Sequence, residues 1–258
     1  MKKYILSFAL IFSLILSGCS GDKTTAGSKS PEGHPKITVD SSTGQITENG
    51  PDIDAEKNIE SDEAKPADNA SDFKYSIDDD SCMILGYSGT SDEVRIPAKI
   101  EGKPVTSLSI GAFLRNKTIK KVIIPDTVTR IGGHTFYECT ALESVEIPDS
   151  VTIIGDFAFA FCTSLKSVNI PDSSKGKSIG NSAFFKCTGL TSVTIGEGVN
   201  YIALHAFRGC TSLTDLTIPD SLTLLQDHAF ANCKISDEKT IEKIKSINPK
   251  ALEKYLID

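Results

Sequence analysis

Phenylalanine recurs at a nearly constant interval through the C-terminal half of this 258-residue chain. Its successive spacings are 23, 23, 25, 23 and 23 residues, and the series comprises Phe113, Phe136, Phe159, Phe184, Phe207 and Phe230. Repetition at such a period is typical of a solenoid, because so short a unit cannot bury its apolar face without stacked neighbours. The series therefore predicts a stack of about six coils.

The repeating unit is clearest between Cys139 and Phe159. Apolar residues alternate at Val145 and Ile147, which predicts a short strand with one buried face. Pro148 should end that strand, because proline cannot donate a hydrogen bond to a continuing ladder. One main strand in each coil predicts a parallel sheet with neighbouring strands about 4.8 Å apart. The two extra residues of the longer unit, around residues 174–177, should bulge outward as a loop.

These motifs resemble the BspA-type leucine-rich-repeat family of bacterial surface proteins. The likeness rests on the order L-x-x-V-x-I, P-D-S-V, I-G, A-F and C-T-S-L, and it covers about residues 72–235. Residues 87–105 also resemble the lead-in of that family. The resemblance implies a leucine-rich-repeat solenoid, a β-dominated α/β superhelix, in a surface protein that binds host matrix proteins. It does not identify the ligand, because a scaffold does not fix a function.

A second column follows the phenylalanines at a distance of three residues. It consists of Asn116, Cys139, Cys162, Cys187, Cys210 and Cys233. An oxidising compartment would favour disulfides, and stacked coils would bring neighbouring cysteines within bridging distance. Parallel side-chain directions suit a bridge poorly, however, and leucine-rich repeats use Asn or Cys here as a buried ladder. We therefore interpret the column as buried free thiols.

The N-terminus has the features of a lipoprotein signal peptide over residues 1–18. Lys2 and Lys3 precede an apolar run from Ile5 to Leu16, which is of signal-peptide length and short for a membrane span. The following Leu16-Ser17-Gly18-Cys19 resembles a lipoprotein cleavage box, with Cys19 as the lipidated residue. An ordinary secretory signal is the alternative. We expect a lipid-anchored protein of the cell membrane, exposed outside the cytoplasm.

Residues 19–71 differ in composition from the repeats. They hold 11 acidic residues against five lysines and few apolar side chains. A segment of this kind cannot bury enough surface to offset its ordering entropy, so we expect a disordered acidic tether. The net charge of the whole chain is −7, and no cluster of lysine and arginine forms a basic stripe. Binding to nucleic acid is therefore not expected.

Both ends of the predicted solenoid, residues 111–235, have candidate caps. Within residues 72–110, apolar residues alternate on both sides of Asp78-Asp79-Asp80-Ser81, which predicts a hairpin. A calcium loop is the alternative, but its ligand spacing is lacking. Within residues 236–258, Ile241, Ile244 and Ile247 recur at helical spacing, and Asn248-Pro249 can begin a second helix.

Two further columns could be mistaken for metal sites. The first is acidic and consists of Asp126, Asp149, Asp172, Glu197 and Asp220. Turn chemistry explains it, and weak cation binding is the alternative. The second contains His134, His205 and His228, where His205 and His228 with Asp227 could form a zinc pair. We interpret the shared position of these histidines as a coincidence, at an exposed position where the residue type varies between coils.

The sequence holds none of the common catalytic or nucleotide-binding motifs, so we expect neither catalysis nor a cofactor. The outward side of the predicted strands is the candidate binding surface. Its binding residues are Lys120, Lys121, Glu143, Glu146, Lys166, Asn169, Thr194 and Thr217. We expect a monomeric, adhesin-like protein that recognises an extracellular protein or glycan. The alternative is a structural or accessory lipoprotein that docks to another envelope component.

Overall fold

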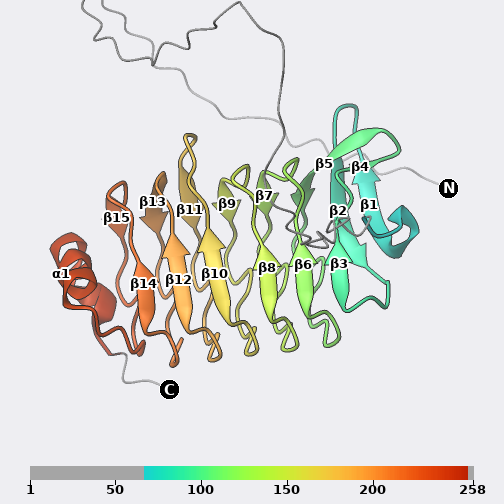
Figure 1. Cartoon of the computed structure of the whole chain (residues 1–258). Coiled ribbons are helices and arrows are strands. Elements are labelled where there is room, and N and C mark those ends of the chain that lie inside the picture. Colours follow the sequence, from blue (N-terminus) through green and yellow to red (C-terminus); the bar gives the residue numbers. More distant parts are fainter. Residues whose placement is uncertain (1–66, 255–258) are drawn as a thin grey trace, which may run out of the picture. The chain divides into compact units, whose positions relative to one another are not determined.

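The computed structural model describes residues 67–254, which form a solenoid of stacked coils (Figure 1). The front of the stack carries short parallel strands whose buried residues face the core. Two three-stranded sheets make up this front: β3 (Glu93–Arg95), β6 (Lys121–Ile123) and β8 (Ser144–Glu146), then β10 (Ser167–Ile170), β12 (Ser192–Ile195) and β14 (Asp215–Thr217). Proline follows five of these six strands within two residues, and glycine follows the sixth, β12, which fits the predicted ends.

The expectation of one main strand in each coil was incomplete, because each coil also contributes to a sheet at the back. This nine-stranded sheet includes β4 (Lys99–Ile100), β5 (Lys103–Leu108), β7 (Arg130–Ile131), β9 (Ile153–Ile154), β11 (Lys177–Ile179), β13 (Val199–Ile202) and β15 (Leu224–Leu225). The second apolar pair of each unit supplies these strands. Since the chain runs the same way in every coil, Ile131, Ile154 and Ile179 pair in parallel register.

An antiparallel hairpin closes the N-terminal end, as predicted. It consists of β1 (Phe73–Ile77) and β2 (Cys82–Tyr87), and β2 continues into the back sheet by pairing with β5. Oδ1 of Asp78 accepts hydrogen bonds from the backbone of Asp80 and Ser81, at 3.1 and 2.7 Å. These bonds make the acidic segment a turn.

The fold begins earlier than the predicted tether boundary at residue 71. The backbone N–H of Asp68 donates to the carbonyl oxygen of Arg95 at 2.9 Å, and Arg95 N–H donates back to the Asp68 carboxylate at 2.9 Å. A 3-10 turn, η1 (Ala70–Asp72), then leads into β1. The acidic composition concealed this boundary, because Asp68 acts here as a backbone partner. Cys19 and the rest of the predicted leader and tether up to residue 66 lie outside the described residues.

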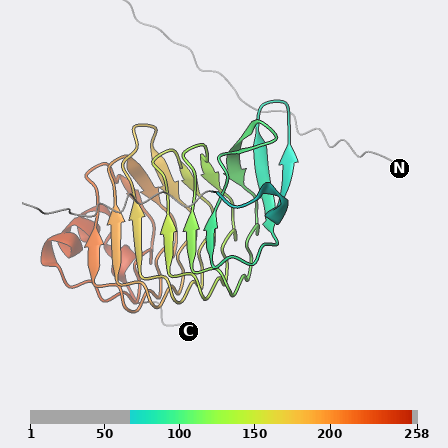
Figure 2. The same cartoon turned by 45° about the vertical axis from the view of Figure 1, so that its right-hand side comes forward.

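Helical segments cover the C-terminal end. They are α1 (Glu238–Ile247) and η2 (Pro249–Leu252). Asp237 caps α1 by accepting from Thr240 N–H at 2.8 Å, and Asn248 caps η2 by accepting from Lys250 N–H at 3.0 Å. Figure 2 shows α1 and the β1–β2 hairpin at opposite ends of the stack. The last four residues of the predicted cap, 255–258, lie outside the described residues.

The phenylalanine column forms the centre of the core. Consecutive rings from Phe113 to Phe230 stack with centroids 4.8, 5.0, 5.0, 4.9 and 5.3 Å apart, and all six side chains are buried. Contacts between aromatic rings add to the stabilisation from area burial. The predicted leucine-rich-repeat solenoid and the phase of its repeat are therefore confirmed.

Tight backbone turns flank each core phenylalanine. Residues two positions before and two positions after it adopt left-handed conformations, for example Phe157 (φ 56°) and Phe161 (φ 62°) around Phe159. The histidines His134, His205 and His228 occupy the first of these turn positions. Within residues 67–254, no helix is both long and apolar enough to cross a membrane.

Candidate binding surface

The front strands carry two columns of outward side chains. Strand register places Asn169 beside Thr194 and Thr194 beside Thr217, and all three are exposed. The other column contains Ser167, Ser192 and Asp215 in the same three strands. Neighbouring parallel strands lie about 4.8 Å apart, so these side chains form one closely spaced polar surface.

The charged part of this face lies on the first front strands. Lys121 Nζ is 2.7 Å from Glu146 Oε1, and Lys120 Nζ is 3.2 Å from Asp92 Oδ2. The structure thus brings Lys121 and Glu146 together, but as partners of one another rather than as two separate ligand contacts. Glu143 and Lys166 are exposed and adjoin across coils, where Lys166 N–H donates to the carbonyl of Glu143 at 3.1 Å.

Sequence reasoning missed β3, which adds a strand to this face. Glu93 and Arg95 lie beside Lys121 and Ile123, and they form an ion pair with a separation of 2.8 Å. The signal was present as Val94-Arg95-Ile96-Pro97, which matches the V-x-I-P end of the later strands. The outward side of the back sheet was also missed, and its column consists of Met83, Ser107, Arg130, Ile153, Ser178, Tyr201 and Leu224.

The thiols of the cysteine column all point at the preceding coil. Each Sγ donates to the carbonyl oxygen of the previous core phenylalanine, with distances from 3.0 Å at Cys139 to 3.3 Å at Cys233. The five cysteines are unbridged, and burial raises the pKa of Cys139 to about 12. Asn116 differs, because its Oδ1 accepts from Thr118 and Ile119 within its own coil. Cys233 is only partly buried.

The acidic column takes part in the turns between front and back strands. Asp172 Oδ1 accepts from Glu197 N–H at 2.7 Å, and the Glu197 carboxylate accepts from Asp220 and Ser221 N–H at 2.9 and 3.1 Å. Carboxylates therefore bind the backbone of the next coil. Among residues 67–254, no group of three or more His, Cys, Asp or Glu side chains is arranged to hold a metal ion.

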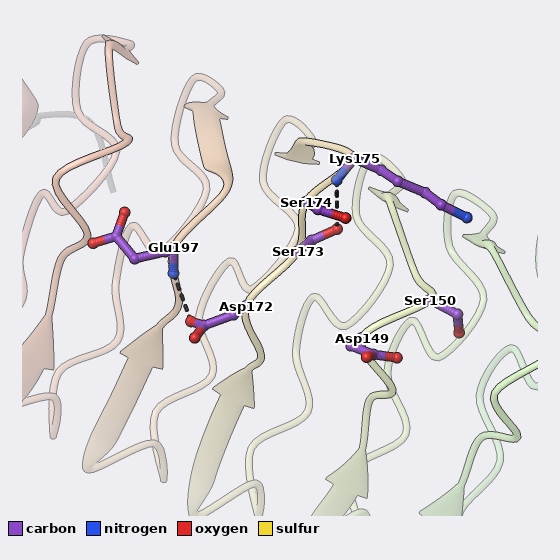
Figure 3. Close-up of a pocket in the computed structure, with 7 residues that line it drawn as sticks. All are labelled: Asp149, Ser150, Asp172, Ser173, Ser174, Lys175 and Glu197. Carbon is purple, nitrogen blue, oxygen red and sulfur yellow. Dashed lines mark hydrogen bonds between the residues drawn. The ribbon is translucent and has the colours of Figure 1, made fainter. Parts of the chain in front are cut away.

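An open groove of about 510 Å³ lies along this edge (Figure 3). Its lining combines carboxylates and hydroxyls, from Asp149, Ser150, Asp172, Ser173, Ser174 and Glu197. Lys175, from the longest turn, completes the lining and extends in Figure 3 toward the coil of Ser150.

The two later histidines stack on neighbouring coils. The ring centroids of His205 and His228 are 5.7 Å apart, and His228 Nδ1 lies 3.2 Å from the carbonyl oxygen of Glu253. Burial, followed by the nearby charges of Arg208 and His228, lowers the pKa of His205. The backbones of both histidines adopt the left-handed conformation, so these residues form part of the turn that precedes the core phenylalanine.

Comparison with known families places this architecture in context. The sequence model of the BspA-type leucine-rich-repeat region matches residues 106–236 and 177–256, with six copies. A comparison with curated protein sequences gives no significant match.

Three crystal structures illustrate the similarity. A leucine-rich cell surface protein from Faecalibacterium prausnitzii is 34% identical, with a TM-score of 0.58 over 67% of this chain and 48% of its own. The T. pallidum leucine-rich-repeat protein is 26% identical, with a TM-score of 0.56 over 71% and 96%. A repeat protein from Eubacterium ventriosum, at 23% identity, has a TM-score of 0.53 over 66% and 52%. This chain thus spans about half the length of two of these proteins.

Proposed function

Because the chain belongs to the BspA-type leucine-rich-repeat family, we propose that it is a lipid-anchored, adhesin-like protein of the cell surface. In this proposal, the front strand face recognises an extracellular protein or glycan, and Cys19 carries the lipid. The protein acts by binding, without a cofactor. The similarity to a leucine-rich cell surface protein supports the location, and the signal-like residues 1–18 support the anchor.

The observation that carries the proposal is the register of Asn169, Thr194 and Thr217. These exposed residues form an ordered polar row on strands that lie open at the front of Figure 1. Extended sheet faces of repeat proteins are their usual binding surfaces. Side chains of this kind offer adaptable hydrogen bonds, whereas the first front strands already satisfy much of their charge internally.

A capture experiment with the full chain tests the proposal. Immobilised protein is exposed separately to extracellular matrix proteins and glycans, and to an extract of the producing cell's own envelope. Retention of a matrix protein or glycan supports the adhesin-like function. Retention of envelope components alone would support the alternative of an accessory lipoprotein.

A triple variant on the face makes the test specific. Asn169→Arg, Thr194→Arg and Thr217→Arg together should weaken binding at least about tenfold, because three long cations fill the row. The matched control places the same substitutions at Thr163, Thr188 and Thr211, which are exposed in the turns before the strands. Equal binding by wild type and the face variant would show that the strand face is not the contact.

A further inference from the structure

One front strand carries an apolar side chain where the others carry a polar one. Ile123 lies on the outward side of β6, between Arg95 of β3 and Glu146 of β8. The corresponding residues of the next three front strands are Asn169, Thr194 and Thr217. The chain neighbours of Ile123, Val122 and Ile124, are buried in the core, whereas Ile123 is only partly buried. Ile123 is therefore not needed to fill the core.

The turn after β3 departs from the repeat in the same direction. In the later coils a carboxylate follows the proline or glycine at the end of the front strand, whereas Ala98 occupies this position in the first coil. Ala98 is exposed, and its carbonyl oxygen accepts from Val105 N–H at 2.9 Å and from Thr127 Oγ1 at 3.2 Å. The turn is thus held by backbone contacts, but it carries no charge at the position of the acidic column.

Both departures line the same open groove, at the C-terminal ends of β6 and β8, which lie side by side in Figure 1. Its volume is about 520 Å³, and the rest of its lining consists of Ile124, Pro125, Asp126, Thr127, Glu146, Ile147 and Pro148. Six of the nine lining residues are apolar. The two exceptions to the repeat therefore increase the apolar character of one site on the front face.

Charged side chains border this groove, and most of them are already paired. Arg95 Nη2 is 2.8 Å from Glu93 Oε1, and Lys121 Nζ is 2.7 Å from Glu146 Oε1. Asp126 is exposed, and its carboxylate has neither an ion pair nor a hydrogen bond within residues 67–254. An apolar centre inside a polar rim is typical of protein–protein contacts, because the rim excludes water from the central contact. The unmatched charge of Asp126 is complementary to a cation of the partner.

The lining favours one of the two ligand classes that the strand face could recognise. The hydroxyl groups of a saccharide need hydrogen-bond partners when they leave water, and the six apolar side chains offer none. The nine lining residues also include no aromatic ring on which a sugar could stack. An apolar side chain of a protein, by contrast, gains free energy in proportion to the area that it buries.

We propose that this groove receives an apolar side chain of a partner protein, with a lysine or arginine of the same segment beside Asp126. The inference rests on the proposed function, and it specifies a protein rather than a glycan as the partner of the strand face. Only β8 separates β6 from β10, on which the polar row of Asn169, Thr194 and Thr217 begins. A single protein can therefore contact both the groove and the row.

A selection from a random peptide library tests the groove without knowledge of the natural partner. Short peptides displayed on phage are selected on the immobilised full chain, and the recovered peptides are synthesised and titrated by calorimetry. At least one of them should combine a Leu, Ile, Met or Phe with a neighbouring Lys or Arg. Isoleucines labelled with ¹³C at Cδ1 report the contact by NMR, and Ile123→Thr identifies the signal of Ile123, which this peptide should shift.

Two variants change the groove in opposite ways. Ile123→Thr removes the apolar contact and Ala98→Leu fills the groove, so each should weaken binding of that peptide about tenfold or more. Neither should unfold the chain, because threonine occupies the same column in β12 and β14, and Ala98 is exposed. Asp126→Asn should weaken binding several-fold at low salt and less at high salt. Ile153→Thr is the matched control on the outward side of the back sheet, and it should leave binding unchanged.

The proposal is overturned if no recovered peptide carries the apolar and basic pair, if such a peptide leaves the Ile123 signal in place, or if its binding survives both Ile123→Thr and Ala98→Leu. Capture of a glycan without any protein would also overturn it, and would leave the strand-face function intact. Conversely, a peptide that meets every criterion, together with equal capture by wild type and the triple arginine variant, would support the groove and contradict the role of the polar row.

Discussion

The thiol of Cys162 donates a hydrogen bond to the carbonyl oxygen of Phe136 in the preceding coil, with an Sγ–O distance of 3.1 Å. That oxygen also accepts the backbone N–H of Cys139 at 3.1 Å. Each core phenylalanine carbonyl from Phe113 to Phe207 thus receives a thiol from the next coil. The cysteine column therefore joins coils through hydrogen bonds, and the sulfur atoms themselves remain unbridged.

We predict that these thiols resist alkylation in the folded protein and all react after denaturation. Burial raises the pKa of Cys139 to about 12 and that of Cys162 well above its ordinary value, so the reactive thiolate is scarce at neutral pH. Cys233 should react first, because it is only partly buried. Mass spectrometry after timed alkylation measures the order. A disulfide between any two of the five would contradict the prediction.

Phe159→Ala should lower the free energy of unfolding by about 3–5 kcal/mol, because it leaves a cavity between two stacked rings. Phe159 is fully buried, with centroids 5.0 Å from those of Phe136 and Phe184. Phe161→Ala is the control, since Phe161 is only partly buried and should cost less. Chemical denaturation measures both changes, and equal losses would be inconsistent with the burial difference.

Gly198→Ala should destabilise the protein by more than about 2 kcal/mol. Gly198 has a φ of 90°, and an added Cβ would overlap the carbonyl oxygen of Ser173 in the neighbouring turn. Gly102→Ala separates the two effects, because Gly102 has a φ of 79° but no atom within 4 Å of an added Cβ. Its cost should be near the left-handed strain alone, about 1–2 kcal/mol. Thermal and chemical denaturation of both variants compare the costs.

The fold could be predicted because each unit repeats the same sequence pattern. Phe136 and Phe159 recur with Cys139 and Cys162 at fixed offsets, so one interpretation of one unit serves the whole stack. The back sheet was missed because segments such as Ile153–Ile154 are too short to show an alternating pattern in the sequence. They become strands only by pairing with the neighbouring coils of the stack. The start of the fold at Asp68 was missed because its partner, Arg95, is 27 residues away.

The candidate sites were harder to predict, since they depend on contacts between coils. The outward direction of Asn169 and Thr194 followed from strand alternation, whereas the pairing of Lys121 with Glu146 required the register between two coils. Lys177 could not be assigned from sequence alone to the column of buried apolar residues that includes Val199. The two inserted residues shift its alignment, and only the pairing with Val199 reveals its position.

Lys177→Val should stabilise the protein at neutral pH, and the gain should shrink as the pH rises. Burial lowers the pKa of Lys177 in the folded state below 10.5, so the unfolded chain binds its proton more tightly. The penalty for burying the ammonium is fully present below the folded-state pKa, and it disappears as the pH approaches 10.5. Urea denaturation of wild type and variant at several pH values measures the difference in their free energies of unfolding. Other titrating groups contribute equally to both proteins, so their contributions cancel in this difference. A gain that does not change with pH would mean that Lys177 is not the titrating group.

Lys166→Glu should slow association with the partner recovered by the strand face. Lys120 and Lys121 are held by Asp92 and Glu146, whereas Lys166 is exposed and has no ion pair among the described residues. An unpaired charge on an open face contributes mainly to the association rate and to its salt dependence. We therefore expect a several-fold lower association rate at low salt and a smaller difference at high salt, measured by surface plasmon resonance. Lys245→Glu on α1 makes the same charge change on another part of the surface and should leave the rate nearly unchanged. Equal rates for wild type and Lys166→Glu would place the contact away from this part of the strand face.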